Sequence, residues 1–228
     1  MGILVSSCDF LNCLEGNGVQ SSEDRVVSGF TGIVNTSSFD VTVYYGNVSS
    51  VTVNADENLM QYIRTYISGG NLILETDQDR CLESVNRIEV SIVCPYIETL
   101  VLSGSGDMEI NDFESDYLKI NLSGSGDIDM NNILVNNTLD ASLSGSGDIN
   151  AEGKSADAKY SLSGSGNIRA EDMVVGDCDV VLSGSGDIHC RFVTSLKGVL
   201  SGSGDVYFVG DNTIENIRVT GSGDVIER

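Results

Sequence analysis

The sequence predicts an all-β protein that folds as a right-handed parallel β-helix, a single-stranded solenoid with about 20 residues per coil. Three observations support this prediction. A glycine-rich pentapeptide returns at a near-constant interval, apolar and polar residues alternate on both sides of it, and the 228 residues include 26 glycines but only one proline. Glycine suits tight corners, and scarce proline suits a backbone whose N–H groups all pair.

The pentapeptide Ser-Gly-Ser-Gly-Asp recurs through the C-terminal half of the chain. Five copies are identical, one has Asn at its last position, and one has Thr at its first. The copies begin at Ser103, Ser123, Ser144, Ser163, Ser183, Ser201 and Thr220, at spacings of 20, 21, 19, 20, 18 and 19 residues. Self-similarity at such a period is the signature of a repeat architecture.

Apolar residues define an inward face on each side of the pentapeptide. The residue after it is Met108, Ile128, Ile149, Ile168, Ile188, Val206 or Val225, and the residue before it is Leu102, Leu122, Leu143, Leu162, Leu182, Leu200 or Val219. Beyond both positions apolar residues alternate with mostly polar ones, which is the pattern of a strand with one buried face. A third, less regular apolar patch lies around Phe113, Ile133, Met173 and Val193.

Each repeat is therefore predicted to be one coil of about three short strands. Coils stacked at the usual strand spacing of ~4.8 Å would make seven of them roughly 30 Å tall. The repeat lacks the leucine-rich consensus, and a propeller blade needs about 40 residues. The right-handed sense is expected by analogy with parallel crossover connections.

The sequence divides into a short N-terminal segment and one long β-helix domain. We interpret residues 1–18 as a signal remnant and lipoprotein tether, and residues 19–228 as a single β-helix domain with irregular coils over 19–99 and seven regular coils over 100–228. Residues 19–99 lack the pentapeptide but keep β-branched, alternating runs such as Val51-Thr52-Val53. The stretch 59–67 could form a helical turn, although its tyrosines and isoleucines favour a strand.

Export is suggested by the first residues. Ile3 to Cys8 reads as the end of a bacterial lipoprotein signal, with Cys8 as the residue that would carry lipid; the alternative is an ordinary apolar N-terminal segment. We therefore expect a location in the cell envelope or at the outer-membrane surface, with the lipid as the only membrane contact. Six cysteines could then form disulfides, whose pairing the sequence leaves open.

The charge balance excludes one class of partner. Asp and Glu outnumber Lys and Arg by 34 to 12, which gives a formal charge of −22. Nucleic-acid affinity rests mostly on basic residues that neutralise phosphates, so no nucleic-acid partner is expected. The charge serves solubility, or it attracts cations or basic partners.

The last residue of each motif copy is expected to stack in one column. This ladder comprises Asp107, Asp127, Asp148, Asn167, Asp187, Asp205 and Asp224. Like charges about 5 Å apart repel, and either calcium or hydrogen bonds from nearby backbone N–H groups would compensate. An amide such as Asn167 accepts those bonds equally well but weakens a cation site, so we favour a structural ladder without metal.

The serial Leu-Ser-Gly-Ser-Gly-Asp-Ile motif resembles the auto-transporter adhesin, head GIN domain family of predicted Bacteroidetes surface lipoproteins. The segments Glu15–Gly18, Ser28–Ile33 and Val90–Ile97 reinforce the resemblance, which covers about residues 13–228. It implies a β-helical fold and an adhesive role at the envelope. It supplies no catalytic or ligand residues to transfer.

No constellation of residues points to catalysis. His189 falls at an outward position without an evident nucleophile beside it, and Cys178 and Cys190 fall at inward positions that suit packing. The enzymatic alternative is a polysaccharide lyase or glycosidase, since β-helices host such enzymes. Its nearest groove would be the outward column of Asp129, Asn150, Arg169, His189 and Tyr207, by fold analogy alone.

The sequence thus favours a non-enzymatic surface protein, without cofactor, that binds a glycan or an extracellular protein; a passive structural envelope protein is the alternative. Exposed aromatics would make the ligand surface, and the candidates are Tyr44, Tyr45, Tyr62 and Tyr66. The last coil, from Val219 to Arg228, would expose an unpaired strand edge. We expect that edge to be covered by a second copy of the chain, giving a homo-oligomer, or by a folded-over segment.

Overall fold

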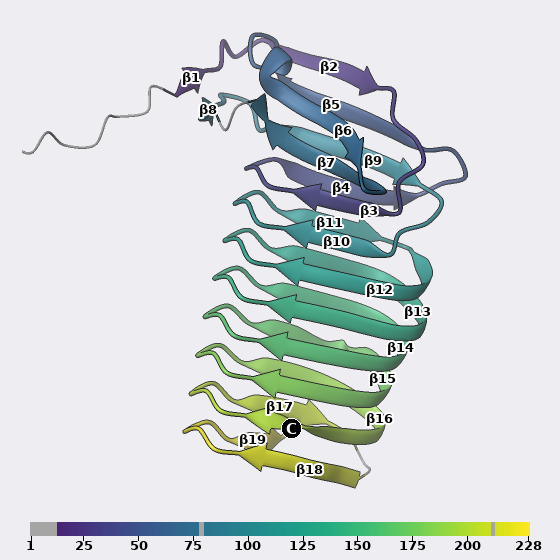
Figure 1. Cartoon of the computed structure of the whole chain (residues 1–228), viewed down its shortest axis with the longest axis vertical. Helices are drawn as coiled ribbons and strands as arrows, with labels where there is room; N and C mark the ends of the chain where they lie inside the picture. Colours follow the sequence, from purple (N-terminus) through teal and green to yellow (C-terminus); the bar gives the residue numbers. More distant parts are fainter. Residues whose placement is uncertain (1–12, 78–79, 211–212) are drawn as a thin grey trace, which may run out of the picture.

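The structure is a computed structural model that describes residues 13–77, 80–210 and 213–228 (Figure 1). The lipidation candidate Cys8 lies outside these residues. Strands form nearly all of the regular structure, and the only helical element in the described part is a 3-10 turn, η1 (Met60–Tyr62). No helix in that part is long and apolar enough to cross a membrane.

The C-terminal part is a column of stacked parallel strands. It contains β10 (Thr99–Leu102), β11 (Met108–Asn111), β12 (Glu114–Leu122), β13 (Ile128–Leu143), β14 (Ile149–Leu162), β15 (Ile168–Leu182), β16 (Ile188–Leu200), β17 (Val206–Val209), β18 (Thr213–Val219) and β19 (Val225–Glu227). Ile128, Ile149 and Ile168 pair directly above one another and are fully buried. The expected β-solenoid with about 20 residues per coil, here about six turns, is confirmed.

Each regular coil differs from the expected three short strands. From β13 to β16, a single strand of 13 to 16 residues runs from one glycine corner to the next. Register shifts bend it at the edge opposite the glycine corners, for example between Met130 and Ile133. A bulge turns a strand without ending its hydrogen bonding, so the far edge needs no loop.

The third apolar patch is buried at Phe113, Ile133 and Met173, but Val193 was predicted wrongly. Val193 is 54% exposed, and Phe192 is buried in its place. The reason is a register shift between β15 and β16, which pairs Val175 with Phe192. This coil is the shortest of the series, with 18 residues between motif copies, so its inward positions move by one residue.

Glycines are required at the motif corners because successive coils touch there through their backbones. A Cβ placed on Gly126 would lie 2.0 Å from the carbonyl oxygen of Gly106, and one on Gly147 would lie 1.9 Å from that of Gly126. The second glycine of each copy therefore cannot carry a side chain without separating two coils.

The N-terminal third is an irregular sheet that continues the column. Its strands are β1 (Leu14–Glu15), β2 (Gln20–Arg25), β3 (Gly32–Asn35), β4 (Asp40–Tyr45), β5 (Ser50–Asp56), β6 (Ile63–Ser68), β7 (Asn71–Thr76), β8 (Leu82–Glu83) and β9 (Glu89–Cys94). β3 and β4 stack in parallel on β10 and β11, and β7 and β9 stack on β3 and β4. These layers follow the expected coil arrangement.

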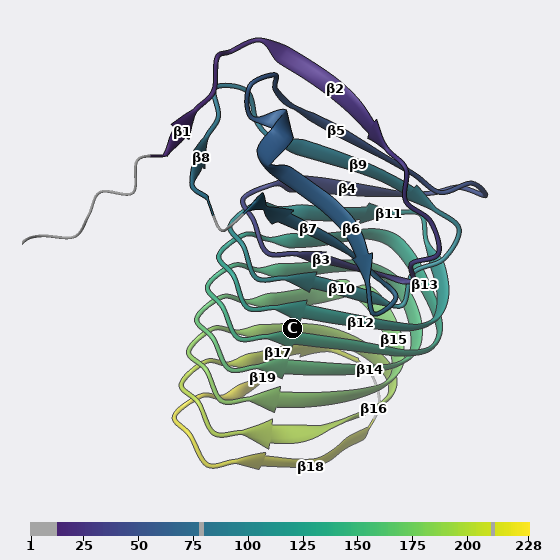
Figure 2. The same ribbon diagram turned by 45° about the horizontal axis from the view of Figure 1, so that its top comes forward.

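The outer strands of this N-terminal sheet do not follow the expected coil arrangement. β2 pairs with β5, β5 with β9 and β6 with β7, all antiparallel, so residues 19–99 are not coils throughout (Figure 2). Gly69 and Gly70 both have positive φ and permit the tight β6–β7 turn. The stretch 59–67 combines both expectations, with the η1 turn followed by strand from Ile63.

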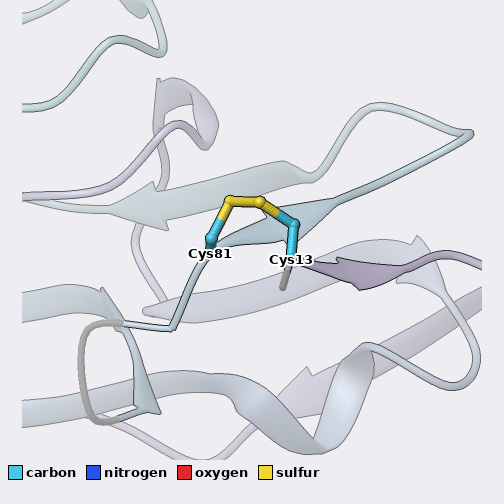
Figure 3. The surroundings of a disulfide bond; sticks show 2 residues. All are labelled: Cys13 and Cys81. Atoms are coloured by element: carbon cyan, nitrogen blue, oxygen red, sulfur yellow. A yellow bond between two sulfur atoms is a disulfide. The ribbon is translucent and has the colours of Figure 1, made fainter. Parts of the chain in front are cut away.

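One contact holds the N-terminal segment to β8, and another holds the loop after β8 to β5. A disulfide joins Cys13 to Cys81, beside the short parallel pair β1 and β8 (Figure 3). Asp56, fully buried, accepts hydrogen bonds from the Val85 N–H at 2.7 Å and the Asn86 side chain at 2.6 Å. Burial acts to raise the pKa of Asp56, but these hydrogen bonds outweigh it and hold the pKa below its usual value.

The opposite end of the column is open. β18 pairs only with β16, and β19 only with β17. Among the described residues no segment folds over this edge. The last coil leaves one row of backbone groups unpaired.

Candidate binding site

The ladder residues lie in one column and are bonded from coil to coil. One oxygen of each of the first six, Asp107 to Asp205, accepts the backbone N–H of its counterpart in the next coil, at 2.6 to 3.0 Å. Asn167 takes part through its amide oxygen, which accepts the N–H of Asp187 at 3.0 Å. The N–H donor of each bond thus belongs to the adjacent coil. The sequence had instead suggested a donor in the same corner as the carboxylate. Each bond draws a carboxylate to a peptide dipole and offsets the repulsion between neighbours.

The ladder also has a member that the motif search missed. Asp40 accepts the Asp107 N–H at 3.1 Å, and residues 36–40 occupy the corner position next to the first motif copy. Their sequence, Thr-Ser-Ser-Phe-Asp, keeps only the final Asp and two small hydroxyl residues of the motif. The usable signal was the alternating run from Val41 to Val43 directly after that Asp.

Some ladder residues also use their second oxygen. Asp148 Oδ2 accepts from Arg169 Nη1 at 2.6 Å, and Asp40 Oδ2 accepts from Arg87 Nη1 at 3.0 Å. Burial acts to raise the pKa of Asp148, but the Arg169 side chain and the Asn167 N–H outweigh it and lower that pKa. In the described part of the chain, His, Cys, Asp and Glu nowhere form a group of three suited to a metal ion.

The motif corners together form a shallow polar groove along one edge of the column. The groove has a volume of about 820 Å³ and is lined by serines and glycines of the first five motif copies. The side chains of these serines are exposed, and their hydroxyls have no hydrogen-bond partner among the described residues. All the lining residues are serine or glycine, so no ionic side chain lines the groove. We call this edge of the column the motif edge.

The outward column from Asp129 to Tyr207 aligns from coil to coil as expected. Its side chains contact one another. Asn150 donates to Asp129 at 2.7 Å, and His189 stacks on Tyr207 with ring centroids 4.8 Å apart. His189 Nδ1 lies 3.4 Å from Glu171 Oε2. Burial lowers the pKa of His189, partly offset by the nearby Glu171 carboxylate. The imidazole is thus packed between its neighbours.

The buried thiols show no sign of a nucleophile. Cys94, Cys178 and Cys190 are free and buried. Burial raises the pKa of Cys94 to about 11. A hydrogen bond with Cys190, together with burial, raises the pKa of Cys178 well above its ordinary value. Both thiols therefore stay protonated near neutral pH.

The four candidate tyrosines do not share one surface. Tyr44 and Tyr45 end β4, which pairs with β9 and β11. Tyr66 lies on β6, which pairs with β7, and β7 pairs with β3. Tyr62 precedes β6 and has the Arg80 guanidinium over its ring at 5.3 Å. In Figure 2, β6 and β7 lie in front of β4 and β11.

Tyr45 borders a cleft at the edge opposite the motif corners. The cleft has a volume of about 500 Å³, and we call it the acidic tyrosine cleft; it is lined by Tyr45, Pro95, Tyr96, Asp112, Glu114, Ser115, Asp116 and Asn136. These residues come from the end of β4, the connection after β9, the turn between β11 and β12, the start of β12, and β13. The turn residue Asp112 has φ 58°, one of the bends that form this edge.

The aromatic walls of the cleft are held in place by packing and hydrogen bonds. Tyr45 is 55% exposed, and its ring packs edge-on against the buried Phe113, with centroids 6.1 Å apart. Tyr96 donates its hydroxyl to Glu98 Oε1 at 3.0 Å. Burial and that carboxylate raise the pKa of Tyr96, so the phenol remains neutral. One ring is therefore available to a ligand without reorganisation.

The polar wall offers mainly hydrogen-bond acceptors. Asn136 Nδ2 donates to Glu114 at 3.2 Å and to Asp116 at 3.1 Å, and Asn132 Nδ2 donates to Asp112 at 2.6 Å. None of the eight lining residues is basic. The cleft can therefore hold a group rich in hydrogen-bond donors against an aromatic face, whereas its charge repels anions.

Comparison with known proteins places this geometry in a family. The sequence profile described as "Putative auto-transporter adhesin, head GIN domain" matches residues 29–212, which is most of the chain. The chain belongs to this family. The resemblance seen in the sequence is confirmed, and a search of curated proteins gave no match.

Solved structures of similar fold come from Bacteroides and Parabacteroides species. A protein titled a putative adhesin from Bacteroides fragilis has a TM-score of 0.89 at 21% identity, covering 94% of this chain and all of that one. One from Parabacteroides merdae has a TM-score of 0.71 at 21% identity, covering 94% and 98%. A protein titled a putative lipid binding protein from Parabacteroides distasonis has a TM-score of 0.75 at 23% identity, covering 94% and 100%. At these identities the likeness shows the fold.

The family and the disulfide together indicate where this adhesin-family protein works. Disulfides persist outside the cytoplasm, and both observations suggest an extracellular or surface location. Neither the family description nor the titles of these relatives names an enzyme.

Proposed function

We propose that this head GIN domain protein is a non-enzymatic adhesin of the cell surface that binds an extracellular ligand in the acidic tyrosine cleft. The observation that supports this most is the preformed cleft lined by both the exposed Tyr45 ring and three carboxylates. We further propose that Cys8 carries a lipid that anchors the chain to the outer membrane.

The ligand is a glycan or an extracellular protein that presents hydrogen-bond donors and no negative charge at the contact. Sugar hydroxyls or amino groups would donate to the carboxylates while an apolar face stacks on Tyr45; a lysine or arginine side chain would make the same two contacts. Acidic polysaccharides are disfavoured by the carboxylates and by the overall charge of −22.

The test is a screen of the lipid-free chain against arrays of glycans and extracellular-matrix proteins, with Tyr45→Ala and Tyr44→Ala in parallel. Tyr44 is the matched control because it precedes Tyr45, is 48% exposed and does not line the cleft. Truncating a central aromatic typically costs about 2 kcal/mol, or roughly 30-fold in affinity. We expect that loss for Tyr45→Ala alone. Absence of any signal would favour a passive envelope protein, and equal binding by both variants would place the site elsewhere.

A further inference from the structure

The two ends of the column are built differently. At the N-terminal end, β2 runs antiparallel along β5, and the adjacent η1 turn contributes the buried Met60. At the other end, the outer edges of β18 and β19 have no strand beside them among the described residues. A repeat column normally needs a terminal unit with a polar outer face.

The open end exposes apolar core positions. Val219 occupies the position of Leu200 in the coil above, where the leucine is fully buried, yet Val219 is 46% exposed. Val225 continues the column of Val206 and Ile217 faces the position of Gly198, and both are only partly covered. The axial core therefore reaches solvent at this end.

The same end is where two copies of an acidic chain could approach with least repulsion. Residues 213–228 contain three acidic and two basic residues, a net charge of −1, whereas the whole chain carries −22. The basic residues, Arg218 and Arg228, are both exposed. Elsewhere like charge would oppose self-association.

We propose that a second copy of the chain covers this end, so that two columns join end to end. A two-fold axis perpendicular to the column would set β18 antiparallel to β18 of the second copy, and likewise β19. Such an interface is self-complementary and closes after two copies. It would pair the free backbone groups of both edges and cover Val219 and Val225.

The position of this contact would allow it to join two cells, an inference that rests on the proposed surface function. Figure 1 places the N-terminal segment and the C-terminal end at opposite ends of the column. An end-to-end dimer then carries its two N-terminal segments at its far ends. Copies held by those segments on two cells would meet between the cells, so a second partner of the adhesin, besides the ligand of the acidic tyrosine cleft, is the same adhesin on a neighbouring surface.

The contact is expected to be weak. Each copy contributes about one coil, near 20 residues, which is at the lower limit of the 20–30 residues per side of a standard interface. A dissociation constant of about 10 µM or weaker is reasonable for such a patch. Many copies on two facing surfaces would compensate through multivalency.

Sedimentation equilibrium of the whole chain over about 10 µM to 1 mM tests the proposal. We expect the average mass to rise from 24.2 kDa towards twice that value. Val219→Asp should stay monomeric, whereas the control Val199→Asp, which alters a 43% exposed valine on β16, should dimerise as the wild type does. A wild type that remains monomeric throughout, or Val219→Asp that dimerises equally, would overturn it.

Beads carrying the chain give a second readout that needs no variant. Beads that hold it through its N-terminus should cluster, and beads that hold it through Arg228 should not; equal behaviour of both would contradict the proposal even if Val219→Asp fails to fold. Tyr45→Ala should still cluster, and Val219→Asp should still bind an array ligand. The two proposals therefore fail separately.

Discussion

The backbone contact at the motif edge makes a specific prediction for Gly126→Ala. The new Cβ would lie 2.0 Å from the Gly106 carbonyl oxygen and 2.7 Å from its carbon. Real Cβ contacts are at least 3.0 Å, so one coil must move by about 1 Å against the next.

That movement is opposed on both sides of the substitution. Ser125 donates its N–H to the coil above, to Gly104 O at 3.1 Å, and Ile128 donates to the coil below, to Asp148 O at 2.9 Å. Overpacking with flexible side chains costs about 1–3 kcal/mol. Since both partners here are backbone, we expect about 3 kcal/mol or more, which for a chain of this size is a fall of roughly 6–12 °C in Tm.

Thermal unfolding followed by circular dichroism measures this loss, with Ser125→Ala as the control. Ser125 is exposed and its hydroxyl has no protein partner, so its removal should change the free energy of unfolding by less than about 0.5 kcal/mol. A Tm of Gly126→Ala within 2 °C (about 1 kcal/mol) of the wild type would refute the close stacking of coils.

Three further predictions concern the ladder and the histidine. Asp127→Ala removes the acceptor of the Asp148 N–H at 2.7 Å and should cost about 1–2 kcal/mol in chemical denaturation, whereas Asp127→Asn should cost less than half of that; equal losses would argue against the ladder bond. EDTA should leave the Tm of the protein unchanged, and a fall of many degrees that calcium restores would show a metal site. The folded-state pKa of His189 is lowered by burial, so the unfolded state binds more protons once the pH falls below ~6.5. The wild type should therefore lose stability relative to His189→Gln between pH 7 and 5.5, and parallel stability curves would exclude this linkage.

The regular column could be predicted because one short motif supplies both the close backbone contact and the inter-coil hydrogen bond in every coil. Its glycines permit backbone contact with the preceding coil, and its final Asp or Asn accepts a hydrogen bond from the next coil. The coil formed by β3 and β4 escaped detection for the opposite reason. It stacks on β10 and β11, but residues 46–98 separate it from them in sequence, and Phe39 stands where Gly106 stands in the next copy.

The acidic tyrosine cleft was only partly predictable. Tyr45 was a candidate because of its residue type, but Tyr96, Glu114 and Asn136 come from separate segments that meet only where coils bend. The positive φ of Asp112 and the register shifts at this edge leave no periodic signal. Strand pairing also separates Tyr66 from Tyr45, which composition alone could not show.

Titration of a ligand identified on the arrays into wild-type and Tyr45→Ala protein most directly tests the claim that the edge opposite the motif corners binds the ligand. We predict that the variant keeps the wild-type melting temperature and loses about 30-fold in affinity, as expected for loss of a central aromatic contact. Unchanged affinity in a folded Tyr45→Ala protein would contradict it.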